Sequence, residues 1–99
     1  MAKLAKRFNK GKTEWSQASF AALEPMVRLL MQAEKSYGKY NWKKGFKRHE
    51  LLDCLTRHVV ALNNNEEIDP TTGMNHIAAV LANSMFYSYH FVIPKAKRK

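Results

Sequence analysis

Three carboxylates and a histidine lie close together in residues 63–76, NNNEEIDPTTGMNH. Glu66, Glu67 and Asp69 fall within four positions, and His76 follows after a proline, two threonines and a glycine. Carboxylate oxygens are the ligands that Mg²⁺ prefers, and the ion completes its shell with waters and phosphate oxygens. The stretch therefore predicts either a Mg²⁺ and phosphate site or, because Asp69 precedes Pro70, only the N-cap and first residue of a helix.

Two polar helix faces are expected beside this stretch. In the segment 48–62, Asp53 and Arg57 share one face, and His58 lies on its flank. In the segment 70–91, one polar stripe runs along an otherwise apolar helix. It consists of His76, Asn83, Tyr87 and His90. A polar stripe of this kind either faces water or lines a cleft, and a surface ion pair between Asp53 and Arg57 is the plainer alternative for the other face.

The segment YGKYNWKKG, residues 37–45, combines flat rings with an amide and two cations. These groups are Tyr37, Tyr40, Asn41, Trp42, Lys43 and Lys44. Stacking of a base and pairing of its phosphates require such side chains together. The segment therefore favours nucleotide binding. The alternative is that Trp42 and Tyr37 cap the hydrophobic core and that the lysines are solvated.

Three helices joined by short connections must position these groups, so the expected fold is all-α. The first helix carries Met26, Leu29 and Leu30 at helical spacing, is expected to have Pro25 in its first turn, and ends at Gly38. The second and third helices are expected at about 48–62 and about 70–91. No alternating strand of useful length occurs. The predicted organisation is a basic N-terminal arm (1–12), one all-α domain (13–93) and a basic C-terminal tail (94–99).

A chain of 99 residues with three helices has a thin hydrophobic core. The third helix is apolar or aromatic over much of its circumference, and such a helix must be covered on more than one side. We therefore expect the chain to form a homo-oligomer, a dimer or larger, whose helices complete a four-helix or larger bundle. The alternative is a monomer with an exposed apolar patch.

The net charge of +9 is confined to the two ends of the chain. Residues 1–12 hold five Lys/Arg and residues 95–99 hold four, whereas the eight Lys/Arg between them are balanced by eight Asp/Glu. Because basic tails give only weak, salt-sensitive attraction to polyanions, nucleic acid is not the expected partner. An RNA- or DNA-binding accessory protein that uses the tails remains the alternative from another class.

One cysteine, Cys54, permits no internal disulfide and suits a reducing compartment. The sequence has no apolar run of about eighteen residues and no signal-peptide pattern. The expected location is therefore the cytoplasm, without a membrane partner.

The chain resembles the dATP/dGTP diphosphohydrolases, a family often encoded by phages and related to the all-α MazG-like nucleotide pyrophosphohydrolases. The resemblance covers about residues 7–89. It rests on the order and spacing of RFNKGK (7–12), YGKYNWKKG (37–45), RH (57–58), EEID (66–69), Gly73, His76 and Asn83. It implies an all-α oligomer, in the bacterial host cytoplasm if phage-encoded, that binds purine deoxynucleotides with Mg²⁺ and splits the triphosphate into a monophosphate and pyrophosphate.

The chain also departs from the family pattern. Ala79 stands where a second histidine is often found, Asn65 stands where glycine is usual, and the E-E-x-x-E motif of MazG-like enzymes is absent. A sparse acidic set puts catalysis in doubt more than binding. The alternative to a Mg²⁺-dependent enzyme is therefore a phage protein on the same scaffold that sequesters a purine or signalling nucleotide without hydrolysing it.

The resemblance, together with the residue types, assigns expected roles. The expected catalytic residues are Glu66, Glu67, Asp69 and His76. The expected Mg²⁺ ligands are Glu66, Glu67, Asp69, Asp53 and Glu34. The expected nucleotide-binding residues are Tyr37, Asn41, Trp42, Lys43, Lys44, Arg57, His58 and Asn83. In this scheme Mg²⁺ neutralises the triphosphate and activates a water molecule.

Overall fold

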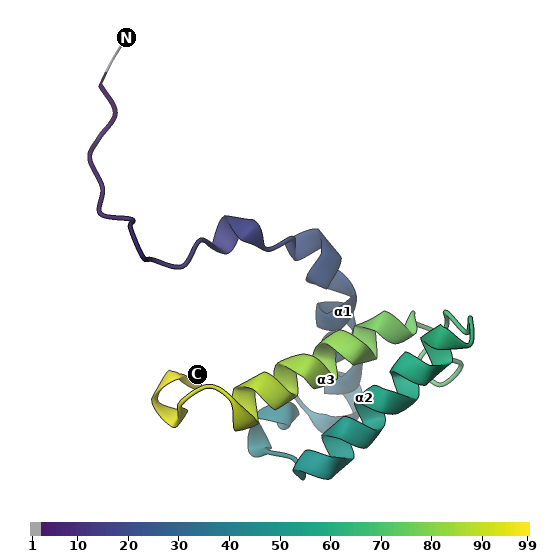
Figure 1. The fold of residues 1–99 in the computed structure, drawn as a ribbon. Coiled ribbons are helices and arrows are strands. Elements are labelled where there is room, and N and C mark those ends of the chain that lie inside the picture. The colour runs from purple at the N-terminus through teal and green to yellow at the C-terminus, as the bar shows by residue number, and fades with distance from the viewer. Residues whose placement is uncertain (1–2) are drawn as a thin grey trace.

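A computed structural model describes residues 3–99 of the chain as an assembly of helices (Figure 1). Three are α-helices: α1 (Phe20–Tyr37), α2 (Arg48–Asn63) and α3 (His76–Phe91). Three are short 3-10 helices: η1 (Trp15–Gln17), η2 (Asn41–Lys44) and η3 (Lys95–Lys97). Within residues 3–99 no strand forms, and the β-type pairing there is a single bridge between Ile68 and Asn75. The prediction of an all-α fold is confirmed.

Helix α3 is the central element, because it packs against both α1 and α2. Helix α1 begins after Ser19, whose side chain accepts a hydrogen bond from the Ala22 N–H at 3.2 Å, and it ends at Gly38 as predicted. The expectation for Pro25 was wrong. The Ser19 cap starts the helix earlier, so Pro25 is the sixth helical residue and leaves the Ala21 carbonyl without its usual donor.

The start of α3 is the main difference from the predicted elements. Residues 69–75 form a tight loop instead of a first helical turn, because the Asp69 N–H donates to the Met74 carbonyl and the Gly73 N–H donates to the Asp69 carbonyl, each at 2.8 Å. The residue that caps α3 is Asn75, whose side chain accepts from the Ile77 N–H at 2.8 Å. The expectation that Asp69 and Pro70 begin the helix was therefore wrong.

The hydrophobic core is thin, as expected. Among residues 3–99, the buried apolar side chains are Leu51, Ala78 and Ala82, of which two are only alanines. Large apolar side chains on the outer faces remain exposed, and Val27 (47%) and Met31 (59%) of α1 are examples. A surface of this kind is typical of a chain that packs against a further partner, so the homo-oligomer stays a prediction.

The two basic ends behave differently. Residues 3–14 run away from the helices (Figure 1), and Phe8 in this arm is 92% exposed. The C-terminal tail instead returns to α3, because the Arg98 guanidinium donates to the carbonyls of His90 (2.8 Å) and Ile93 (3.3 Å). Carbonyls at a helix C-terminus lack intrahelical donors, so Arg98 closes the end of α3. No helix within residues 3–99 is long and apolar enough to cross a membrane.

Candidate functional site

His58 of α2 and His76 of α3 face each other where the two helices are joined by the acidic loop. Their Nδ1 atoms are 2.8 Å apart. His76 is buried, at 5% exposure, and its Nε2 lies 2.9 Å from the Glu66 carboxylate. Because an ionised carboxylate only accepts hydrogen bonds, Nε2 carries the His76 proton and the Nδ1 lone pair points at His58. His58 then donates its Nδ1–H to that lone pair.

The loop turns two of its three carboxylates toward the histidine pair. Glu66 contacts His76, and the Asp69 Oδ2 lies 3.9 Å from the His58 Nδ1. The second oxygen of Asp69 accepts from the Thr71 N–H at 2.9 Å, which holds the carboxylate in place. The third carboxylate, Glu67, is turned to the surface and accepts from the Asn75 side chain at 3.1 Å. Glu66, Asp69, His58 and His76 therefore form one cluster, and Glu67 lies at its edge.

The environment of His58 favours its neutral form. Burial lowers the pKa of His58 below the ordinary 6.5, the Asp69 carboxylate opposes this shift, and His76 and Arg57 add to it. A neutral imidazole can offer a ring-nitrogen lone pair to a cation, which a protonated one cannot do. At neutral pH His58 therefore presents a neutral imidazole beside the Asp69 carboxylate.

The polar stripe of α3 forms a seam with α2. The Asn83 side chain donates to the Ala79 carbonyl at 2.8 Å and lies 3.5 Å from the Cys54 sulfur. The Tyr87 hydroxyl accepts from the Arg48 Nε at 3.0 Å. His76, Asn83 and Tyr87 thus contact α2 instead of facing water. His90 instead lies 2.7 Å from the Trp42 carbonyl of η2.

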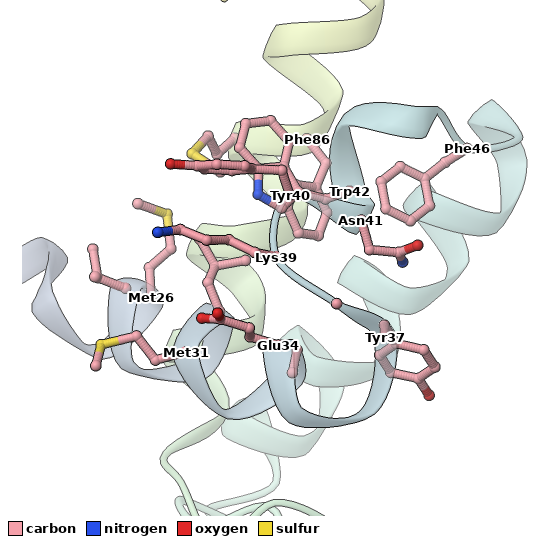
Figure 2. Close-up of a pocket in the computed structure, with 15 residues that line it drawn as sticks. Met26, Met31, Glu34, Tyr37, Lys39, Tyr40, Asn41, Trp42, Phe46 and Phe86 are labelled. Carbon is pink, nitrogen blue, oxygen red and sulfur yellow. The ribbon is translucent and has the colours of Figure 1, made fainter.

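A cavity of about 600 Å³ opens between α1, η2 and α3 (Figure 2). Its volume lies in the range of sites for single small molecules. Figure 2 shows Tyr40 and Trp42 on one side of the cavity and Met26 and Met31 of α1 on the other. The polar side chains at its wall are Glu34, Lys39 and Asn41. The cavity therefore combines an apolar interior with a few polar groups, as a base-binding pocket does.

Three predicted nucleotide-binding residues, Tyr37, Asn41 and Trp42, line this cavity. Trp42 also stacks on Phe86 at 5.6 Å, so its ring both caps the core and borders the cavity. Tyr40, one of the flat rings that favoured nucleotide binding in residues 37–45, was left out of the expected binding residues but also lines the cavity. It adopts a left-handed backbone with φ 61°, which lets its ring line the wall. Nothing in the local sequence distinguishes Tyr40 from Tyr37 in this respect.

The predicted cations lie outside the cavity lining. The Lys43 ammonium stands over the Tyr40 ring at 4.4 Å, so a cation borders the cavity next to a lining ring. Lys44 is exposed at the end of η2, and Arg57 is exposed on α2. Among residues 3–99, no ion pair joins Arg57 to Asp53.

The cavity and the His/carboxylate cluster lie on opposite sides of α3. His76 belongs to the cluster and Met85 to the cavity wall. These residues are nine positions apart, which is about two and a half helical turns and about 14 Å along the axis. At these two positions the cavity wall and the cluster therefore face different sides of α3 and are separated along its axis.

The five predicted Mg²⁺ ligands do not converge. Glu34 lines the cavity, Asp53 is exposed on α2, and Glu67 points to the surface. In the described part of the chain, the potential metal ligands with donor atoms within 4.8 Å of one another are His58, Asp69 and His76. Glu66 lies on the other side of the His76 ring and is outside this group. The residues therefore fit Mg²⁺ only where Asp69 offers one carboxylate and a nucleotide and waters supply the other oxygens.

Comparison with known proteins identifies the family. The chain belongs to the family described as dATP/dGTP diphosphohydrolase, N-terminal, which matches residues 2–98. A curated relative, the dATP/dGTP diphosphohydrolase of Salmonella phage PMBT28, is 35% identical over 80 residues, which are 81% of this chain and 27% of the relative. The chain thus spans about a quarter of the relative's length. No solved structure matches it. The predicted family is confirmed.

Proposed function

We propose that the chain binds purine deoxynucleoside triphosphates and splits them into a monophosphate and pyrophosphate. The observation that carries the proposal is the aromatic-lined cavity of about 600 Å³, in a chain whose family and relative are named for dATP/dGTP diphosphohydrolase activity. The relative is much longer than this chain. Nucleotide binding is the part of the relative's activity that the cavity of this chain supports first.

The cavity supports a purine base as its occupant. The rings of Tyr40 and Trp42 offer faces for stacking, which contributes about 1–3 kcal/mol per base. The Glu34 carboxylate can accept from an exocyclic amine or ring N–H of a purine, and the Asn41 amide can both donate and accept. Lys43 stands beside Tyr40, where it can pair with phosphate oxygens.

The His/carboxylate cluster supports the chemistry at the phosphates. Asp69 would offer a carboxylate to a Mg²⁺ ion carried by the nucleotide, which when bound neutralises phosphate charge. Glu66 keeps the buried His76 in one tautomer. Arg57, exposed on the same helix as His58, can hold a phosphate oxygen with its guanidinium. Glu67 is bonded to Asn75 and has the weakest claim to a catalytic role.

Because the cavity and the cluster face opposite sides of α3, the proposed site is shared between two copies of the chain. The base would occupy the cavity of one copy, and the phosphates would meet the cluster of the other. Val27 and Met31 line the cavity and remain largely exposed, so the second copy could pair with the first at the open side of the cavity. The homo-oligomer expected from the thin core is then required for a complete site.

The direct test is incubation of the chain with each of the four dNTPs and Mg²⁺, followed by detection of pyrophosphate. We expect turnover of dATP and dGTP and little of dCTP or dTTP. The matched control is Asp69→Asn, which keeps the acceptor for the Thr71 N–H but removes the negative charge. The proposal is contradicted if no dNTP is turned over, even at an enzyme concentration well above that of a typical assay.

Nucleotide binding without hydrolysis is the second candidate. It is favoured by the scattered carboxylates, because Glu34, Asp53 and Glu67 lie away from the cluster. Calorimetry separates the two candidates. Tight binding without Mg²⁺, with the nucleotide recovered intact, supports sequestration, whereas Mg²⁺-dependent binding with pyrophosphate release supports the enzyme.

A further inference from the structure

We propose that His58, His76 and Asp69 form a binding site for one divalent transition-metal ion, with Zn²⁺ as its simplest probe. The donor atoms of the three side chains lie within 4.8 Å of one another, and the two Nδ1 atoms are 2.8 Å apart. None of the three residues is exposed, so their side chains lose little freedom on binding an ion. The site shares Asp69 with the proposed nucleotide activity, but binding of the ion can be measured without any nucleotide.

The donor set selects the class of ion. Two of the three ligands are imidazole nitrogens, which suit Zn²⁺, Co²⁺, Ni²⁺ and Fe²⁺, whereas Mg²⁺ and Ca²⁺ take oxygen ligands. A pair of histidines with one carboxylate is a common donor set for Zn²⁺ and non-haem Fe²⁺. If this ion occupies the cluster, Asp69 is its ligand, and a nucleotide-borne Mg²⁺ keeps mainly to phosphate oxygens.

Glu66 makes the hydrogen bond to His76 that a histidine bound to a metal usually makes through its other ring nitrogen. Its carboxylate lies 2.9 Å from the His76 Nε2 and accepts the proton on that nitrogen. A histidine that binds a metal typically donates its other N–H to a carboxylate in this way, which fixes the ring and raises its basicity. The His76 Nδ1 lone pair is therefore already turned toward His58 and the ion position.

The geometry needs small side-chain movements only. An ion bound at about 2.0–2.1 Å by both nitrogens in a tetrahedral site separates them by about 3.3 Å, so the 2.8 Å contact must open by about half an ångström. Asp69 Oδ2, at 3.9 Å from the His58 Nδ1, must approach by a similar amount. The His58 proton moves from Nδ1 to Nε2 by exchange with water, so the ring stays neutral and no net charge is created on it.

Three protein ligands leave at least one coordination position for water or an anion oxygen. If the proposed function holds, this position can take a phosphate oxygen of the nucleotide. Phosphate binding at this position rests on the proposed function, whereas metal binding can be measured without any nucleotide.

The test is titration of the tag-free, chelator-treated chain with Co²⁺, followed by visible absorption, and with Zn²⁺, followed by calorimetry. We expect one ion per chain, a Co²⁺ visible band that Zn²⁺ abolishes, and no displacement by a large excess of Mg²⁺. The variants His58→Ala and Asp69→Asn should each weaken binding about 100-fold, and Glu66→Gln about tenfold as an outer-shell change. Circular dichroism verifies that each variant is helical.

His49→Ala is the matched control, because His49 is an exposed histidine on the same helix as His58. It should bind Co²⁺ and Zn²⁺ like the unchanged chain. The proposal is overturned if the unchanged chain gives no saturable one-to-one binding, if Mg²⁺ displaces Zn²⁺ readily, or if His49→Ala loses as much affinity as Asp69→Asn. Asp69→Asn keeps the test decisive if His58→Ala does not fold.

Discussion

The Asn75 side-chain oxygen accepts the Ile77 N–H at 2.8 Å, and the same side chain donates to Glu67 at 3.1 Å. Asn75 thus caps the start of α3 and also holds the acidic loop against the helix through Glu67. Because the helix begins here, Asp69 is free of capping α3, and its carboxylate can face His58 instead. The position of one cap therefore decides which carboxylates can take part in the site.

Replacement of Asn75 by alanine should lower the free energy of unfolding by about 1 kcal/mol, because an N–H at the helix N-terminus loses its acceptor. Urea unfolding followed by circular dichroism measures the change. The control is Asn64→Ala, at the exposed C-terminal end of α2. Equal stability of Asn75→Ala and the unchanged chain would contradict the capping role.

Glu66 should contribute to stability as well as to the site. Its carboxylate bonds the buried His76. Glu66→Ala leaves that N–H without its partner and should cost about 1 kcal/mol, while Glu66→Gln keeps an acceptor and should cost less. Thermal melting measures both. Glu67→Ala is the control, and a larger loss for Glu67→Ala than for Glu66→Ala would refute the assignment.

Nucleotide binding should depend on Tyr40. The change Tyr40→Asn removes the ring and keeps a residue type that tolerates the left-handed backbone at φ 61°. Loss of one base-stacking partner should weaken binding of dATP or dGTP about tenfold or more. The control is Tyr87→Phe, which alters a hydroxyl on the α2 side of α3. Calorimetry that finds equal affinity for Tyr40→Asn and the unchanged chain would place the base elsewhere.

A site shared between two copies predicts complementation. The single variants Tyr40→Asn and Asp69→Asn should each be poorly active, since each damages one half of every site. Co-expressed chains form mixed oligomers in which some sites combine an intact cavity with an intact cluster. Pyrophosphate release should then exceed the sum of the two variants alone. Activity equal to that sum would mean that each chain holds a complete site by itself.

The stability of the metal-free protein should fall at mildly acidic pH. Burial holds the pKa of His58 below 6.5, so the unfolded chain binds the His58 proton more readily than the folded one. The contribution of His58 is fully present above pH 6.5 and is lost as the pH falls toward the lowered pKa of the folded state. Urea unfolding with a chelator, compared between the unchanged chain and His58→Gln, isolates this effect. A pH dependence equal in both would contradict it.

The end of α1 and the extent of α2 could be predicted from the sequence, because local signals specify them. Apolar residues at helical spacing, such as the half-buried Leu29 and Leu30, mark the less exposed face, and Gly38 ends α1 with a positive φ of 86°. The family could also be predicted from the sequence, because the resemblance rests on the order of short motifs along the chain. Neither prediction requires knowing which distant residues contact each other.

The start of α3 and the makeup of the site were decided by tertiary structure. Asp69 followed by Pro70 is a sound local start for a helix. The loop nevertheless folds back, because the His76 N–H bonds the Glu67 carbonyl at 2.8 Å and Gln32 of α1 donates to the Thr72 carbonyl at 3.1 Å. Side-chain packing between helices then sets two imidazoles 18 residues apart at 2.8 Å, a meeting that no local pattern specifies.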